Sequence, residues 1–193
     1  MSQTVGKMSD GNRSDSGTGS VGGSVCQYNI ADVLIRVATV ADLADIHRMQ
    51  ISLADHELPF DDNIDLALKK PEKSGYIGYV NIEEKIRLDD NYVVVAEAAG
   101  KVVGVCYGQI KKDDDWSKLD VFGYVGCVFV ERAYRGGGEN GVWPRMLLEL
   151  ENWFRDRNIQ QIRLDCYEGN VGAIKSYQKL DFKPHQIIMT KNL

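Results

Sequence analysis

The feature that most restricts how this chain folds is a run of glycines between an apolar segment and an amphipathic one. Residues 134–141 read Tyr-Arg-Gly-Gly-Gly-Glu-Asn-Gly and follow the apolar stretch 121–130. Behind them, apolar side chains recur at the spacing of one helix face: Met146, Leu147, Leu150, Trp153 and Phe154. Consecutive glycines let a backbone approach a ligand closely, and the N–H groups that open a helix attract anions. The pattern predicts a cradle for a phosphate or pyrophosphate, with positive charge from Arg132 and Arg135; a loose surface turn is the alternative.

Two common phosphate-binding motifs fit this loop poorly. Residues 136–141 match Gly-x-Gly-x-x-Gly, but 131–135 separate the strand from the first glycine, whereas the dinucleotide fingerprint needs an immediate turn. The motif also begins after more than two thirds of the chain, which leaves no room for a Rossmann domain. A P-loop is excluded because no Lys-Ser or Lys-Thr pair follows the glycines.

Hydrophobic patterning along the rest of the chain predicts alternating strands and helices. Strands are expected at 33–40, 92–98, 101–110, 121–130, 162–167 and 187–190. Helices are expected at 41–58, around 64–70, around 81–87, from 144 onwards and at 171–180. A short Ala-Gly-Lys connection at 99–101 is typical of a β-hairpin between the second and third strands. The order of elements places the chain in the α/β class, as one layered domain.

Composition narrows the class of protein further. The chain has 23 Lys and Arg against 28 Asp and Glu, and the resulting net charge of −5 does not suit a general nucleic-acid binder. No apolar run approaches the ~20 residues of a membrane span, so no membrane partner is expected. In residues 1–25, 12 are Ser or Gly, which predicts a flexible tail ahead of a folded domain at 26–193.

The cysteines are few and lie far apart in the sequence, with no CxxC and no neighbouring histidine pair. They are Cys26, Cys106, Cys127 and Cys166. This usage is typical of reduced, mostly buried thiols in a cytoplasmic protein. It offers neither a zinc site nor the partner that a catalytic thiol needs, so no metal is expected.

Two spaced motifs carry a resemblance to a known family. The first is Val128-Phe-Val-Glu-Arg-Ala-Tyr134-Arg-Gly-Gly-Gly138, and the second is Asn170-x-x-Ala173-x-x-x-Tyr177-x-x-x-Asp-Phe182. In this order and on these elements they resemble the GNAT superfamily of N-acetyltransferases. The chain departs from the family pattern at Arg132 for proline, at Asp181 for glycine, and at Asn140, where the third motif glycine is expected and Gly141 comes one place late. The glycine loop is therefore longer than usual, and the N–H groups that meet a pyrophosphate stay open over 139–143.

The resemblance implies a fold with a mixed central sheet, in the order β-α-α-β-β-β-α-β-α-β, and helices on both faces. It also implies that acetyl-CoA, as co-substrate, lies in the opening between 121–130 and 162–167. The residues implied to bind it are Val128, Phe129, Val130, Arg135, Gly136, Gly137, Gly138, Asn140, Gly141, Asn170 and Tyr177. For Asn170, an ordinary helix N-cap is the alternative role.

The chemistry expected from the resemblance centres on Tyr177. A phenol of ordinary pKa ~10 can protonate a departing thiolate whose thiol has a pKa of ~8.5, although a core aromatic is the alternative for this position. The attacking amine must lose a proton, and the strand 121–130 holds no acid to take it. We expect Tyr124 to order a water, with Glu97, Asp120 or an acid of 55–62 as the final acceptor. His56 lies where relatives place acceptor-binding residues, and a solvated loop histidine is its alternative role.

These features lead to a function hypothesis with one main alternative. The chain is expected to be an acetyl-CoA-dependent N-acetyltransferase, monomeric or homodimeric, acting on a primary amine of a small molecule or peptide. The missing strand carboxylate and the irregular glycine loop favour the alternative, a catalytically silent acyl-CoA-binding module. Acidic residues within 55–62 and at 113–115 suggest an entrance for a cationic amine, or equally a solvated rim.

Overall fold

A mixed five-stranded sheet forms the centre of the protein. The computed structural model describes residues 29–61, 81–191 and 193, so the predicted tail 1–25 and the predicted helix around 64–70 lie outside the described residues. The strands follow the sheet order β1-β2-β3-β4-β5 and run as β1 Leu34–Val37, β2 Asn91–Ala98, β3 Lys101–Lys112, β4 Val121–Val130 and β5 Ile162–Leu164. The first four strands are antiparallel, whereas β5 is parallel to β4.

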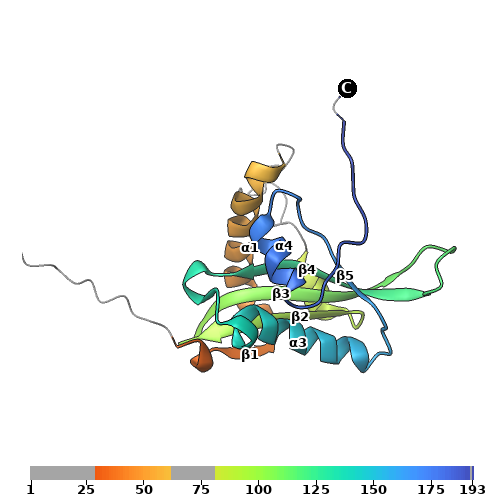
Figure 1. The fold of residues 1–193 in the computed structure, drawn as a ribbon. Helices are drawn as coiled ribbons and strands as arrows, with labels where there is room; N and C mark the ends of the chain where they lie inside the picture. Colours follow the sequence, from red (N-terminus) through yellow and green to blue (C-terminus); the bar gives the residue numbers. More distant parts are fainter. Residues whose placement is uncertain (1–28, 62–80, 192) are drawn as a thin grey trace, which may run out of the picture.

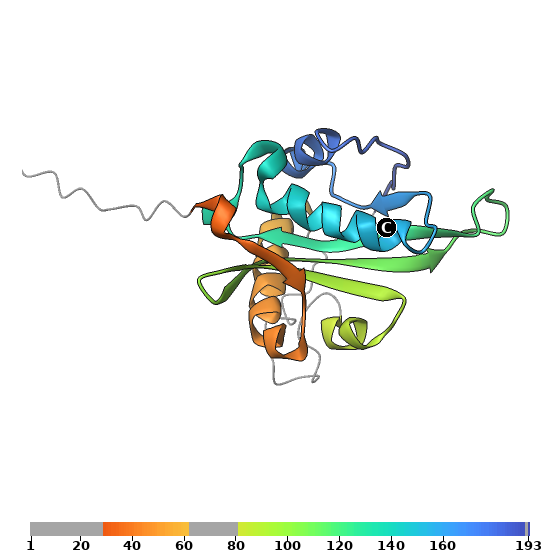
Figure 2. The same cartoon turned by 90° about the horizontal axis from the view of Figure 1, so that it is seen from below.

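Helices cover both faces of this sheet (Figures 1 and 2). On one face lie α1 (Leu43–Glu57) and α2 (Ile82–Arg87), and on the other α3 (Val142–Arg155) and α4 (Val171–Gln178). Alternate residues of β2 face the two layers, because side chains along a strand point to opposite sides. Val93 and Val95 pack with the first pair of helices, and Val94 and Ala96 with α3. The predicted α/β class, with a mixed sheet and helices on both faces, is confirmed.

Local signals explain the hairpin and the start of α1. Ala99 and Gly100 both have positive φ, 50° and 74°, as a two-residue turn between antiparallel strands requires. Before α1, the Asp42 carboxylate accepts a hydrogen bond from the Thr39 N–H at 2.7 Å and a bidentate pair from Arg36 at 2.8 Å. This turn ends β1 at Val37, which is why the first strand is shorter than predicted.

The predicted last strand is wrong. Ile187–Thr190 is not a strand in the described part of the chain, and Ile187, Ile188 and Met189 are 80–87% exposed. The apolar run has the composition of a strand, but a strand also needs a neighbouring edge, and the segment runs away from the sheet (Figure 1). The strand expected at 162–167 is likewise shortened to Ile162–Leu164.

A bulge in β4 interrupts its pairing with β3. The register between β3 and β4 shifts by one residue between Val105 and Tyr107, and Cys127 takes a left-handed φ of 53° at this point. An extra residue in one strand bends it and disrupts pairing locally. Pairing between β4 and β5 extends only from Gly123↔Ile162 to Val125↔Leu164. Beyond this short segment, β4 is not paired with β5 in the described part of the chain, and we call this unpaired stretch the opening.

None of the helices in the described ranges is long and apolar enough to span a bilayer.

Candidate active site

The backbone of β4 beyond the bulge points into this opening at alternate residues. The Glu131 N–H donates to the Val103 carbonyl at 2.8 Å, so Glu131 and Phe129 direct their backbone groups to β3. Because these groups alternate along a strand, those of Val128 and Val130 face the other way. The Val130 carbonyl accepts a hydrogen bond from Arg135 Nε at 2.7 Å. Of the three predicted strand residues, Phe129 therefore uses its backbone inside the sheet.

The glycine loop needs its glycines for two different reasons. Gly136, Gly137 and Gly138 have φ values of 100°, 83° and 58°, a left-handed run that other residues adopt only at a cost. Gly141 has ordinary φ, but a Cβ placed there would collide with the Gly136 carbonyl oxygen. The loop is thus a folded turn with its own close contact, and not a loose connection.

The loop leads directly into the N-terminus of α3. Gly141 caps this helix without a side-chain hydrogen bond, and its own N–H donates to the Gly138 carbonyl at 3.1 Å. Pro144 has no N–H, and the Arg145 N–H donates back to the Gly141 carbonyl at 3.2 Å. The donors that this helix start presents are therefore the N–H groups of Val142 and Trp143. Within the predicted range 139–143, the Gly141 N–H is therefore engaged inside the loop.

Charged side chains around the loop have distinct partners. The Arg135 guanidinium lies 5.5 Å from the centroid of the Phe129 ring in addition to its bond to the strand. Arg132 and Glu139 are exposed, so the carboxylate of Glu139 points to solvent. Arg145 donates to the carbonyls of Ile30 at 3.1 Å and Val33 at 2.6 Å, which fixes the start of the described chain on α3. Arg135 and Arg132 are the cations nearest the loop in sequence that face outward.

Tyr177 lies on α4 beside the start of α3. Its ring makes edge contacts with the rings of Trp143 and Phe182, each at a centroid distance of 6.0 Å. Burial raises the pKa of the Tyr177 hydroxyl, and the charge of Glu57 adds to the shift, so the phenol keeps its proton. Asn170 caps α4 by accepting a hydrogen bond from the Ala173 N–H at 3.2 Å. The N-cap role of Asn170 is thus observed, and its role toward a cofactor stays a prediction.

Aromatic and acidic side chains gather on the α1 side of the opening. The Tyr124 hydroxyl donates to Asp165 at 2.9 Å, and the Tyr167 hydroxyl donates to Asp61 at 3.2 Å. The Phe60 ring stacks on Tyr167 at 6.2 Å and meets the ring of His56 at 6.0 Å. We call this group the aromatic cluster, and its members are His56, Phe60, Asp61, Tyr124, Asp165 and Tyr167. Burial raises the pKa of Tyr124, and its bond to Asp165 adds to this, so its proton is held by that carboxylate.

One of the predicted acids within 55–62, Glu57, acts on several of these groups through its charge. Glu57 is the last residue of α1. Burial raises the pKa of several groups around the opening, and the negative charge of Glu57 adds to the shift of Tyr124, Cys127, Tyr167 and Tyr177. The sequence placed an acid somewhere in 55–62, but no local pattern indicates which residue of the helix end faces β4.

The other predicted acids are engaged elsewhere. Glu97 accepts a hydrogen bond from Arg36 at 2.7 Å on β2, and Asp120 is exposed at the end of β4 opposite the bulge. Asp113 is held by a bidentate pair from Arg163 at 2.7 and 2.9 Å. The hairpin part of the predicted acidic entrance is therefore partly neutralised, and the acids nearest the opening are those of the aromatic cluster and Glu57.

The described cysteines do not form a reactive centre. Cys106, Cys127 and Cys166 are all free thiols. Burial raises the pKa of each, that of Cys127 to about 12, so they stay protonated at neutral pH and are poor nucleophiles. Within the described ranges, no three His, Cys, Asp or Glu side chains come close enough to hold a metal ion.

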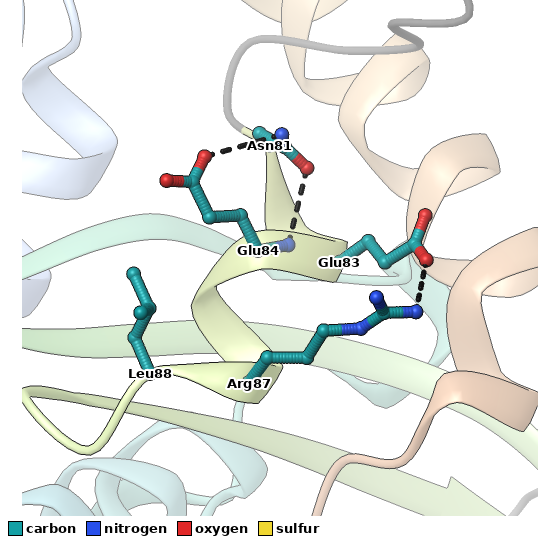
Figure 3. Close-up of a pocket in the computed structure, with 5 residues that line it drawn as sticks. All are labelled: Asn81, Glu83, Glu84, Arg87 and Leu88. Carbon is teal, nitrogen blue, oxygen red and sulfur yellow. Dashed lines mark hydrogen bonds and ion pairs between the residues drawn. The ribbon is translucent and has the colours of Figure 1, made fainter.

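A cavity of about 320 Å³ lies away from these groups, at α2 (Figure 3). Its polar side chains bind one another: Arg87 pairs with Glu83, and Asn81 accepts a hydrogen bond from the Glu84 N–H at 3.2 Å. None of its lining residues belongs to the two motifs, so the cavity adds nothing to the site at the sheet opening.

Comparison with known proteins identifies the family. The model of the acetyltransferase (GNAT) family matches residues 54–182, which include the opening, the glycine loop and Tyr177. The chain belongs to this family, and it is an enzyme of the N-acetyltransferase type. No curated protein matches the sequence.

Solved structures share the fold at low sequence identity. A predicted acetyltransferase with acetyl-CoA from Clostridium acetobutylicum has a TM-score of 0.60 at 18% identity, over 83% of this chain and 96% of that chain. A GCN5-related N-acetyltransferase from Ralstonia eutropha JMP134 gives 0.62 at 16% identity, over 83% and 98%. The aminoglycoside N-acetyltransferase AAC(6')-Iy in complex with CoA gives 0.60 at 17% identity, over 83% and 99%.

Proposed function

We propose that this enzyme transfers the acetyl group of acetyl-CoA directly to a primary amine of a small molecule or peptide. The observation that carries the proposal is the opening between β4 and β5. At one end it has helix N–H groups with no acceptor among the described residues, along one side outward-facing strand backbone, and beside it the protonated hydroxyl of Tyr177. These are the groups needed to hold a long anionic thioester and to protonate its leaving group.

The chain offers donors that fit such a cofactor. The N–H groups of Val142 and Trp143, together with Arg135, suit its pyrophosphate, because a helix start and a nearby cation both favour negative charge. The backbone of Val128 and the N–H of Val130, whose carbonyl is bound by Arg135, suit the amides of its pantetheine arm. The Trp143 side chain is 8% exposed, and its indole N–H has no partner among the described residues. A buried donor without a partner is costly in a folded protein, and a bound acceptor oxygen relieves that cost.

The chemical step uses two groups of the chain. When bound, acetyl-CoA supplies the activated acetyl carbon. An alkylamine of pKa ~10.4 must first lose a proton, and we assign this to Glu57, directly or through a water held by Tyr124. Tyr177 then protonates the departing sulfur, and the surplus proton of the acetylated nitrogen restores its hydroxyl. The raised pKa of Tyr177 keeps the proton in place until then, and a thiolate leaving into the same buried surroundings is correspondingly more basic.

Raised thiol pKa values disfavour a mechanism in which a cysteine takes the acetyl group before the amine does. The thiols of Cys127 and Cys166 both have raised pKa values, so neither is ionised enough to take the acetyl group first.

The acceptor side is aromatic and acidic, which suits an amine that carries positive charge before it reacts. The alternative function is a silent acyl-CoA-binding module, which the absence of an acid from β4 favours.

The test compares Tyr177→Phe with Tyr92→Phe in an assay of thiol release over a panel of amines. Tyr92 is also a half-buried tyrosine whose pKa burial raises, to about 12, but it stacks on Trp153 away from the opening. We expect Tyr177→Phe to lower kcat by about 10²- to 10⁴-fold with little change in the Kd for acetyl-CoA, and Tyr92→Phe to keep kcat. Unchanged kcat would remove Tyr177 from the chemistry. Binding without thiol release above hydrolysis would favour the silent module.

A further inference from the structure

One lysine of the chain lies against Tyr124, a member of the aromatic cluster. The Lys111 ammonium sits 3.5 Å from the centroid of the Tyr124 ring, at the distance of a cation–π contact. Lys111 is half-buried on β3, opposite Phe122 of β4. An aromatic face that binds the side-chain ammonium of a lysine is suited to bind other primary alkylammonium groups, so Lys111 occupies a position that fits an acceptor.

The Tyr124 ring connects this ammonium with the start of the opening. Tyr124 pairs with Arg163 of β5, yet its hydroxyl reaches Asp165, two residues further on, so the side chain leans toward the bulge. The bulge at Cys127 lies three residues along β4, about 10 Å at the rise of a strand. The charge of Glu57 also adds to the raised pKa of Tyr124.

Neighbouring lysines are held in other ways. Lys85 Nζ donates to Asn91 at 3.1 Å and to Gln109 at 3.0 Å, and lies over Tyr107 at 4.5 Å. Lys112 is exposed and pairs with Asp115 at 3.3 Å. Because side chains alternate along β3, Lys112 points to the other face of the sheet from Lys111. Lys111 is therefore the lysine of this group whose ammonium contacts Tyr124.

We propose that Lys111 is acetylated by its own chain, as an internal acceptor of the acetyl group. The step is the one assigned to external amines and rests on that proposed function. The Lys111 ammonium first loses a proton to Glu57 or water, and its nitrogen then bonds to the acetyl carbon. The carbon–sulfur bond of acetyl-CoA breaks, coenzyme A departs as the thiol with a proton from Tyr177, and the second proton of the nitrogen restores the Tyr177 hydroxyl. A tethered amine reacts without the entropy loss of a bimolecular encounter.

The modification also changes the site. Acetylation removes the charge of Lys111 and with it the cation–π contact, so the face of Tyr124 becomes available to an external ammonium. Self-acetylation would thereby free the face of Tyr124, which Lys111 covers in the unmodified protein.

The test follows the purified chain with acetyl-CoA and no added amine, by intact mass and peptide mapping. We expect one acetyl group on Lys111, formed with a first-order rate constant that does not depend on protein concentration. Lys111→Arg keeps the positive charge but cannot form this amide, and should stay unmodified. Lys112→Arg is the matched control and should be acetylated like the wild type. Tyr177→Phe should slow modification of Lys111 and leave slow chemical acetylation of exposed lysines unchanged.

The outcomes separate this inference from the proposed function. Acetylation of Lys85 or Lys112 in place of Lys111, or a rate that rises with protein concentration, would overturn the assignment. External amines acetylated while Lys111 stays unmodified would do the same and leave the proposed function standing. Calorimetric binding of acetyl-CoA without transfer to any amine would overturn both.

Discussion

Replacing Gly141 by alanine tests whether the folded glycine loop positions the donors that hold the cofactor. The added Cβ would collide with the Gly136 carbonyl oxygen, so the two backbone segments must separate by about 1 Å to restore an ordinary contact. Neither atom is at the end of a flexible side chain. The shift must therefore pass into the loop and into the first turn of α3, where the N–H groups of Val142 and Trp143 lie.

The expected size of the effect follows from this geometry. Forcing a group into a packed site costs about 1–3 kcal/mol, and each kcal/mol lowers Tm by about 2–4 °C in a chain of this length. Misplacing one hydrogen bond to a charged phosphate costs about 1.5–3 kcal/mol, which raises the Kd for acetyl-CoA by about 10- to 100-fold. Gly141→Ala should therefore lower both stability and affinity.

Gly100→Ala is the matched control for this change. Gly100 has a φ of 74° with no atom within 4 Å of a built Cβ, and it lies in the hairpin between β2 and β3. Its substitution strains the backbone by about 1–2 kcal/mol without touching the glycine loop. In thermal melts both variants should lose Tm, whereas in calorimetry only Gly141→Ala should lose affinity. If Gly141→Ala bound acetyl-CoA like Gly100→Ala, the loop would not position the cofactor donors.

Three further changes probe the remaining groups. The hydrogen bond from Arg36 outweighs the opposing effect of burial and lowers the pKa of Asp42 to about 2. Asp42 therefore stabilises the folded protein above its unfolded-state pKa of ~3.9, and this stabilisation is lost as the pH falls toward 2. Melts should show this acid loss, about 2 kcal/mol, in the wild type and not in Asp42→Asn; equal acid profiles would contradict it. Glu57→Gln should lower kcat by about 10²-fold or more and flatten the acidic limb of the pH–rate profile. The control Asp120→Asn should keep the wild-type kcat and profile. A wild-type profile in Glu57→Gln would exclude Glu57 as the base. Gly169→Ala places a Cβ 2.8 Å from the ring of Phe60, a member of the aromatic cluster. It should change the KM for the amine in steady-state kinetics, while the Kd for acetyl-CoA in calorimetry stays the same.

The signals that predict the cofactor half of the site are local. Left-handed glycines, a helix start without a side-chain cap and the spacing from Asn170 to Tyr177 all lie within short stretches of sequence. What the sequence could not determine was which N–H groups the longer loop presents. That depends on the contact between Gly136 and Gly141, which only the folded loop makes.

The acceptor half could not be predicted, because its contacts join residues that are far apart in the sequence. Asp61 and Tyr167 form a hydrogen bond across 106 residues of sequence, and Glu57 acts on tyrosines of β4 and α4 only because the end of α1 packs there. The failed strand at 187–190 has the same origin. Residue composition reports whether a segment tolerates an extended backbone, but pairing depends on which edge is within reach.

The separation of the two halves has a consequence for how such an enzyme diversifies. Phe60 and Asp61 lie in the connection after α1, whereas the donors proposed for the cofactor lie between Val128 and Tyr177. Residues near Phe60 can be exchanged without moving the glycine loop. The acceptor specificity can therefore change during evolution without intermediates that no longer bind acetyl-CoA. Mutational libraries limited to this connection are accordingly the economical route to new acceptors, since most of their members keep an intact donor half.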